Sequence, residues 1–258
     1  MRPTRRWVLS AAGAFSAAPA LAAPSAADVR LWTAYEARLR ARLADAGGGT
    51  FDAAAREALD LTNVARRRAG AGSLAWHDDL AATARAHAAD LTRLAYVEHV
   101  TAEGFDPSHR FWLLARRTIG SPSENIAYHR GPKPASIPQL MNLLRASPKH
   151  WANALRRTHT HAGFGLVRRG DRNYLVGLYA RPLTELADPL PFRAGRADLA
   201  RAFRELAPEL RPRLAVPQGA ALGKVEGGPP VMQIAAARHL GGPSYELIGG
   251  PIFLASDA

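Results

Sequence analysis

The chain contains no cysteine among its 258 residues. This absence excludes disulfide bonds, thiolate nucleophiles and cysteine-ligated metal centres. Three motifs of common enzyme classes are missing as well: the His-Glu-x-x-His helix, the phosphate-binding P-loop and the Gly-x-Ser-x-Gly elbow. The sequence therefore carries no signature of the corresponding zinc proteases, P-loop nucleotide triphosphatases or α/β-hydrolases.

Lysine is scarce, since it supplies only three of the 34 basic residues, yet the net charge is +12. A charge of this size is typical of proteins that bind nucleic acid. The arginines, however, lie in scattered pairs such as Arg116-Arg117 and Arg156-Arg157, and they form no basic helix face interleaved with aromatic residues. The pattern predicts no nucleic-acid partner and a weak attraction to anionic surfaces of the cell envelope.

Residues 1–22 have the pattern of an export signal. Arg5-Arg6 lies in a twin-arginine motif, a mild apolar stretch follows, and Ala20-Leu21-Ala22 resembles a cleavage site. The alternative is a general secretory signal with a chance arginine pair. Both predict a periplasmic or secreted protein, and the first adds the twin-arginine export machinery as a partner. Because residues 7–22 are too few for an ordinary membrane span, we expect at most peripheral membrane contact.

Residues 23–50 predict an amphipathic helix followed by a glycine linker. Over 27–45 the apolar residues fall on one stripe, the arginines lie elsewhere, and Gly47-Gly48-Gly49 ends the pattern. Such a helix can lie on a membrane, but packing against the main domain is the ordinary arrangement. The stripe consists of Trp32, Tyr35, Leu39 and Leu43.

Residues 51–184 are predicted to form the main domain. Asp78-Asp79 should cap one of its helices, and His87, on the apolar face of that helix, is expected to be a hydrogen-bonded core histidine. Residues 97–135 predict a loop-rich segment. The expected helices cover 51–68, 78–96, 111–117, 137–146 and 150–155, and a β-hairpin covers 164–179.

Residues 185–258 are rich in proline and glycine, which argues against a long helical domain. One amphipathic helix is expected over 196–207, and two short strands over Val231–Ile234 and Tyr245–Leu254. No catalytic motif occurs in this part of the chain. We therefore expect an accessory extension that packs against the main domain.

A series of short motifs occurs in a characteristic order between residues 52 and 182. The motifs are Asn63-x-x-Arg66, Leu74-x-Trp76, His99, Pro107-Ser108-His109-Arg110, Ser123-Glu124-Asn125-Ile126-Ala127, Ser147-Pro148-Lys149-His150 and Gly163-Phe164-Gly165. In this series the chain resembles the CAP superfamily (the SCP domain), in its bacterial exported form. The superfamily includes cysteine-rich secretory proteins, venom allergens and plant pathogenesis-related proteins. The resemblance implies an α+β fold: a CAP-type α-β-α sandwich with a central, mostly antiparallel sheet, to which this chain adds an N-terminal helix and a C-terminal extension.

Three positions depart from the family pattern. Ser123 stands where the family usually has glycine, which would cost about 1 kcal/mol if that backbone is left-handed. Leu144 stands where the family usually has tryptophan. Residues 143–146 contain no acid to match the second cavity glutamate of the animal and plant members. The two-His, two-Glu cavity of the family is thereby reduced to one glutamate and two histidines.

The resemblance implies that His99, Glu124 and His150 converge in the fold. Two imidazoles and a carboxylate can hold Zn²⁺ or another divalent cation and leave positions open for water. Asn125 is expected to line the same ligand cleft and to pin a loop through its donor and its acceptor. The alternative is a hydrogen-bonded polar cluster in which Glu124 braces the fold.

Other candidate residues have plainer interpretations. His159 and His161 alternate as strand residues would, which predicts a solvent-facing pair in preference to a metal site. Ser147 precedes a proline and should cap a helix. A serine–histidine pair of Ser123 and His99 is conceivable, but no spacing specifies it.

Three hypotheses of function follow. Members of the CAP superfamily bind lipids, sterols and divalent cations, so the leading hypothesis is an exported binding module. Its cleft of His99, Glu124, Asn125 and His150 would take a small amphiphilic or envelope-derived ligand, or a divalent cation.

The alternative is a metal-assisted hydrolase of peptide or cell-wall material, with Glu124 as ligand or general base and the two histidines as ligands. In the third, the CAP domain is a scaffold and residues 185–258 do the recognition. The sequence leaves open whether the protein is an enzyme.

Overall fold

The computed structural model describes residues 22–45, 51–204, 206, 210–221, 231–241 and 244–256. Two predicted features therefore lie outside the described residues: nearly all of the export signal, and the glycine linker.

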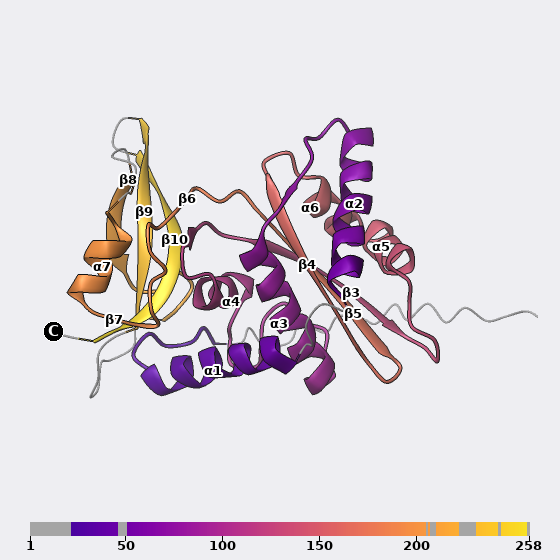
Figure 1. Ribbon diagram of the computed structural model, residues 1–258, viewed down its shortest axis with the longest axis horizontal. Helices are drawn as coiled ribbons and strands as arrows, with labels where there is room; N and C mark the ends of the chain where they lie inside the picture. Colours follow the sequence, from indigo (N-terminus) through magenta and orange to yellow (C-terminus); the bar gives the residue numbers. More distant parts are fainter. Residues whose placement is uncertain are drawn as a thin grey trace, which may run out of the picture.

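The main domain is a three-layer sandwich (Figure 1). Its middle layer is a four-stranded sheet in the order β1-β4-β5-β3. β5 pairs antiparallel with β3 and β4, whereas β1 pairs parallel with β4. The α+β class and the mostly antiparallel sheet are thus confirmed. The strands are β1 (Ala75–Trp76), β3 (Ser123–Arg130), β4 (His161–Arg169) and β5 (Arg172–Ala180).

Helices cover both faces of this sheet. α3 packs on one face with α4 and α1 beside it, and α2, α5 and α6 pack on the other. Alternation along β5 explains the two cores, because Val176 and Leu178 face α3 while Leu175 and Tyr179 face α2. The helices are α1 (Val29–Asp45), α2 (Asp52–Arg68), α3 (Asp78–Leu94), α4 (Pro107–Leu114), α5 (Ile137–Ala146) and α6 (Pro148–Leu155).

Two glycines on β4 let α3 lie close against the sheet. A Cβ at Gly163 would collide with the backbone of Ala81, and one at Gly165 with the backbone of Arg85. These positions therefore require glycine for packing, and neither has a left-handed backbone.

The N-terminal helix packs on the main domain, as predicted. Trp32, Tyr35 and Leu39 are buried in the same core as α3. The Tyr35 ring stacks on Phe105 with the centroids 3.9 Å apart, so the apolar stripe is covered by protein. Among the described residues no helix is both long enough and apolar enough to cross a membrane.

The C-terminal extension forms a second sheet, drawn in orange and yellow in Figure 1. Its strand order is β7-β10-β9-β8, and β2 and β6 form a separate small antiparallel pair. Val231, Ile252 and Leu254 join the core that also holds the buried side chains of α4, which confirms that the extension packs against the main domain. The remaining elements are β2 (Thr118–Ile119), β6 (Thr184–Glu185), β7 (Arg193–Ala194), α7 (Arg196–Ala202), β8 (Leu210–Ala215), β9 (Val231–Gly241) and β10 (Ser244–Ala255).

Several predicted boundaries are wrong. The supposed loop at 97–135 contains α4, β2 and the eight-residue strand β3. α4 begins four residues before the predicted start because Asp106 and His109 form a capping box around Pro107. The helix expected over 196–207 ends at Ala202, and the strands expected to be short extend to 11 and 12 residues. The domain boundary at 184/185 stays a prediction.

Two predicted helix caps have the right position without the predicted bond. Asp78 and Asp79 lie in the first turn of α3, where His77 is the N-cap residue and no side chain caps the helix. The two carboxylates still favour this end through the helix dipole. Ser147 is the N-cap residue of α6, and its side chain likewise makes no capping hydrogen bond.

Candidate functional site

His99, Glu124 and His150 come together from three separate segments. Glu124 lies on β3, His150 on α6, and His99 in the segment between α3 and α4. The Nδ1 atom of His99 is 2.8 Å from Oε1 of Glu124. The ring centroids of His99 and His150 are 6.2 Å apart. The convergence implied by the family resemblance is therefore present.

Arg110 is the main partner of Glu124. Both side chains are buried, with exposed fractions of 0% and 1%. Nη2 of Arg110 donates to both carboxylate oxygens of Glu124, at 3.1 and 3.0 Å. The same guanidinium donates to the carbonyl oxygens of His99 and Phe105. Arg110 thus ties α4 to β3 and holds the segment that carries His99.

No role of Arg110 was predicted from the sequence pattern. The available signal was its place in the family motif Pro107-Ser108-His109-Arg110, because that motif lies close in the chain to the Glu124 motif. A buried carboxylate needs a cation or several hydrogen-bond donors. This requirement would have pointed to the arginine in the motif.

The charge of Glu124 is fixed by its surroundings. Burial alone would raise its pKa, but Arg110, then His87 and the hydrogen bond from His99, lower the pKa of Glu124 to about 2. Glu124 is therefore an anion at neutral pH. Because the carboxylate accepts the Nδ1–H of His99, the Nε2 atom of this half-exposed ring is left for a ligand.

His87 closes the inner side of the cluster. The residue is fully buried, and its Nε2 atom lies 3.2 Å from the carbonyl oxygen of Glu98 and 3.7 Å from Oε1 of Glu124. Burial and then the charge of Arg110 lower the pKa of His87 to about 4. His87 is thus neutral at pH 7 and donates to the Glu98 carbonyl. The prediction of a hydrogen-bonded core histidine is confirmed.

Asn125 begins a second set of polar contacts. Its Nδ2 donates to the carbonyl oxygen of His150 at 2.8 Å, and its Oδ1 accepts from Nδ2 of Asn153 at 3.0 Å. Oδ1 of Asn153 in turn accepts from Oγ of Ser123 at 2.8 Å. Asn125 therefore uses both its donor and its acceptor, as predicted, and it positions the backbone of α6 at His150.

The prediction of an exposed pair of His159 and His161 is wrong. His159 is 8% exposed and precedes β4, which begins at His161. Its ring stacks on Tyr179, and its Nε2 atom lies 3.2 Å from Oγ of Ser123. Burial, then the charges of Arg156 and Arg66, lower the pKa of His159 to about 4. Packing on Tyr179 removes this histidine from solvent.

Ser123 causes no strain in the place of the family glycine. It lies in the extended strand β3, and among the described residues only Ala95 is a non-glycine residue with positive φ. Its histidine neighbour is His159, so the conceivable pairing with His99 is not among its contacts.

The donor set does not fit a metal bound by all three residues. The oxygens of Glu124 already accept from Arg110 and His99, and the guanidinium would repel a cation placed on them. In the part of the chain that the structure describes, no group of three or more His, Asp or Glu side chains is placed to hold a metal ion. Glu124 instead orients His99, and a three-ligand metal site stays a prediction.

A groove of about 220 Å³ lies between α2 and α5, next to α6. Its walls include the apolar side chains of Leu61, Met141 and Trp151. Its rim carries Arg68 and Arg145, and the Arg145 guanidinium lies 5.2 Å from the Trp151 ring centroid. None of the residues that line this groove is acidic. An apolar wall with a cationic rim suits an amphiphile with an anionic head.

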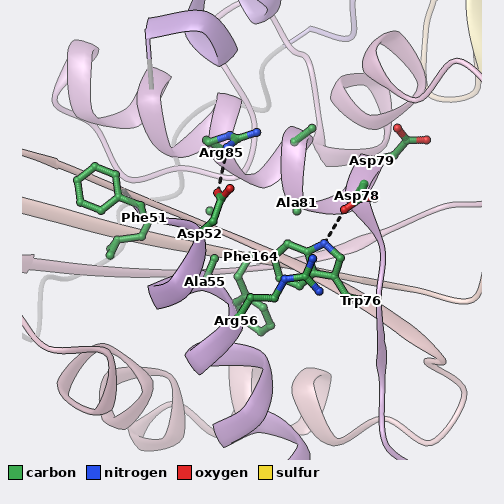
Figure 2. A pocket seen from close by; sticks show the side chains of 13 residues that line it. Phe51, Asp52, Ala55, Arg56, Trp76, Asp78, Asp79, Ala81, Arg85 and Phe164 are labelled. Atoms are coloured by element: carbon green, nitrogen blue, oxygen red, sulfur yellow. Dashed lines mark hydrogen bonds and ion pairs between the residues drawn. The ribbon is translucent and has the colours of Figure 1, made fainter. Parts of the chain in front are cut away.

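A larger cleft, of about 350 Å³, lies where α2 and α3 begin, above β4 (Figure 2). Both of its arginines are engaged inside the cleft, as Figure 2 shows. Arg85 pairs with Asp52 at 3.1 Å, and Arg56 lies 3.9 Å from the ring centroid of Trp76. Asp52, Asp78 and Asp79 line this cleft beside the two arginines, so its charges do not favour an anionic ligand.

Comparison with known proteins identifies the main domain. Residues 59–179 match the model of the cysteine-rich secretory protein family, CAP. The chain carries a CAP domain. No curated protein sequence matches the chain.

Three solved structures are similar to about half of this chain. An outer surface protein of Borrelia burgdorferi has a TM-score of 0.44 at 16% identity, over 49% of this chain and 91% of that protein. An extracellular SCP-domain protein of Bacillus anthracis has a TM-score of 0.41 at 21% identity, over 50% of this chain. A cysteine-rich secretory protein of Staphylococcus aureus has a TM-score of 0.36 at 17% identity, over 51% of this chain. The chain spans 40% of the length of each of the last two proteins.

We expect the Arg110–Glu124 pair to be strongly coupled. Arg110→Gln and Glu124→Gln should each lower the free energy of unfolding by about 3–5 kcal/mol, because each leaves one buried charge without its partner. The double variant should lose less than the sum of the two. Urea unfolding measures all three. Arg130→Gln, at an exposed ion pair with Asp171, is the control and should leave the midpoint nearly unchanged. Additive losses would contradict the coupling.

We also expect stability to fall as the pH is lowered from about 6.5 to about 4. The pKa of His87 is about 4 in the folded protein and 6.5 in the reference state, so the unfolded chain binds more protons in this window. Removing this titration with His87→Gln should reduce the pH-dependent loss by about 2–3 kcal/mol. His129→Gln is the control. Urea unfolding at several pH values checks the slope, and an unchanged slope in His87→Gln would refute the assignment.

Proposed function

We propose that the protein is an exported binding module for an amphiphilic molecule of the cell envelope that has an anionic head. The observation that carries this proposal is the groove between α2 and α5, whose walls are apolar and whose charged residues are all arginines. The predicted export signal and the net charge of +12 agree with an anionic partner outside the cytoplasm.

The size of the groove favours a single acyl chain. Drug-sized ligands occupy pockets of about 300–1,000 Å³, and the groove of about 220 Å³ is smaller than that range. A chain gains about 0.8 kcal/mol for each methylene that it buries. Arg68 and Arg145 would hold the head group through paired N–H donors. A rigid ring system of several fused rings fits this groove less well.

The cluster of His99, Glu124, Asn125 and His150 is a second proposed binding site, separate from the groove. Burial and then the neighbouring His99 lower the pKa of His150, so its ring is neutral at pH 7. Glu124 and Asn125 position the two imidazoles near one another. The two rings could bind a polar group, or a divalent cation such as Zn²⁺, while Glu124 stays bound to Arg110.

No observation favours the metal-assisted hydrolase of peptide or cell-wall material. A general base works best when its pKa lies near the operating pH, and the pKa of Glu124 is about 2. Its oxygens are also engaged by Arg110 and His99. The scaffold hypothesis is weakened because Val231 and Ile252 of the extension share a core with α4, so deleting the extension would expose that core.

The groove is tested with a fluorescent long-chain carboxylate, cis-parinaric acid, below its micelle concentration. Met141→Asp should abolish binding, and an Arg68→Ala/Arg145→Ala variant should weaken it on the order of tenfold, since it loses the charges that hold the head. Leu143→Asp is the matched control on the same helix, because Leu143 is 43% exposed and does not line the groove. Equal binding by Met141→Asp and Leu143→Asp would refute the groove as the site.

The histidine pair is tested by calorimetric titration with Zn²⁺. Binding with one ion per chain that disappears in His99→Gln/His150→Gln would support the pair as the ligands. His129→Gln, on the same strand as Glu124, should bind as the natural protein does. Unchanged binding in the double variant would limit the cluster to supporting the fold.

A further inference from the structure

The cleft of about 350 Å³ where α2 and α3 begin has no part in the proposed function. Its volume lies within the range of about 300–1,000 Å³ that is typical of pockets for small molecules. Figure 2 shows that the two helices approach each other here, where Asp52 of α2 pairs with Arg85 of α3. The buried part of the lining is apolar and consists of Ala55, Ala81, Phe164, Gly165 and Leu166.

The charges around this apolar lining are balanced. The cleft is lined by three carboxylates and two guanidiniums, those of Asp52, Asp78, Asp79, Arg56 and Arg85. A third guanidinium, that of Arg168, lies 5.7 Å from the ring centroid of Phe51, which is also part of the lining. An ion of either sign would therefore meet like charges as well as opposite ones. The cleft favours a polar ligand without net charge.

The two arginines of the lining offer hydrogen-bond donors to such a ligand. The guanidinium of Arg56 lies 3.9 Å from the ring centroid of Trp76, and it makes no hydrogen bond or ion pair with the residues that the structure describes. Stacking on the ring holds the guanidinium in place while its N–H groups stay available. In Arg85, Nη1 donates to Asp52, whereas the buried Nε has no acceptor among the described residues.

Asp78 and Asp79 offer acceptors beside these donors. Oδ1 of Asp78 accepts from the indole Nε1 of Trp76 at 2.7 Å, and Oδ2 of Asp79 accepts from Oγ1 of Thr118 at 2.9 Å. Each carboxylate is thus held through one oxygen, and the other oxygen has no side-chain donor within the described part of the chain. Polar groups that are held before a ligand arrives lose less entropy on binding.

We propose that this cleft binds a neutral pyranose sugar. Each hydroxyl group of such a ring both donates and accepts, and the C–H groups on its faces are apolar. The hydroxyls donate to the carboxylates of Asp78 and Asp79 and accept from the guanidinium of Arg56. A planar carboxylate or guanidinium bridges two neighbouring hydroxyls, and hydrogen bonds to charged groups are the strong ones. A C–H face of the sugar packs on the apolar lining at Phe164.

This site is separate from the groove and from the histidine cluster of the proposed function. The cleft uses the start of α2, whereas the groove uses the second half of the helix from Leu61 to Arg68. A sugar and an amphiphile can therefore occupy one chain together. Met141→Asp, which tests the groove, should leave sugar binding unchanged, so the two proposals stand or fall independently.

The test is an NMR titration of the isotope-labelled full chain with glucose, galactose, mannose and N-acetylglucosamine. The reporter is the indole N–H signal of Trp76, which is identified by its absence from the spectrum of Trp76→Phe. Because this N–H donates to Asp78, a ligand bound to that carboxylate changes its chemical shift. At least one of the four neutral sugars should shift the signal to saturation.

Charged counterparts of the sugar that binds best measure the selection against charge. The 2-amino sugar, at slightly acidic pH where its amine is protonated, adds a positive charge to the same ring. The uronic acid adds a negative charge. Each should bind at least several-fold more weakly than the neutral sugar, because each meets like charges in the cleft.

Two variants test the residues. Arg56→Ala and Asp78→Ala should each weaken sugar binding on the order of tenfold, since each removes a charge-assisted hydrogen bond. Arg67→Ala and Asp60→Ala are the matched controls, because both residues are exposed on α2 and neither lines the cleft. All four side chains are exposed, and thermal unfolding of each variant confirms that the fold is kept.

Saturable binding of a neutral sugar that is weakened by Arg56→Ala and Asp78→Ala supports the cleft as the site. The proposal is overturned if none of the four neutral sugars shifts the Trp76 signal, or if a charged counterpart binds as tightly as the neutral sugar. It is also overturned if the two control variants weaken binding as much as the two test variants.

Discussion

The buried ion pair between Arg110 and Glu124 is the contact on which the candidate site depends. A carboxylate on β3 and a guanidinium on α4 are both withdrawn from water, which is costly unless each neutralises the other. Arg110 also donates to the carbonyls of His99 and Phe105, so the pair sets the path of the chain between α3 and α4. The position of His99 beside Glu124 follows from these bonds.

The same pair limits the chemistry of the cluster. Arg110 stabilises the anionic form of Glu124 and occupies both of its oxygens, so the carboxylate is a poor proton acceptor. What Glu124 can do is orient the ring of His99. The arrangement therefore suits binding better than bond cleavage. The groove that we propose as the ligand site also favours ligands with negative charge, in keeping with a chain whose basic residues are almost all arginine.

Much of the fold could be predicted from local patterns. The stripe from Trp32 to Leu43 and the apolar face that holds His87 follow the helical period, and both elements form. β3 escaped prediction because Glu124 and Asn125 occupy buried strand positions that are usually apolar. Their burial is possible only because Arg110 and Asn153 satisfy them. The long hairpin of β9 and β10 was underestimated because alanine and glycine, which favour strands weakly, interrupt it.

The sequence by itself determined the CAP domain, the helices with a clear apolar period and the set of polar residues from which a site could be made. The order of the motifs also implied that His99, Glu124 and His150 would meet. Only the tertiary structure decided how those residues are used. Arg110 neutralises Glu124, and His159 turns inward onto Tyr179. Such partnerships join residues that are distant in the chain, and burial makes them strong, so no local pattern records them.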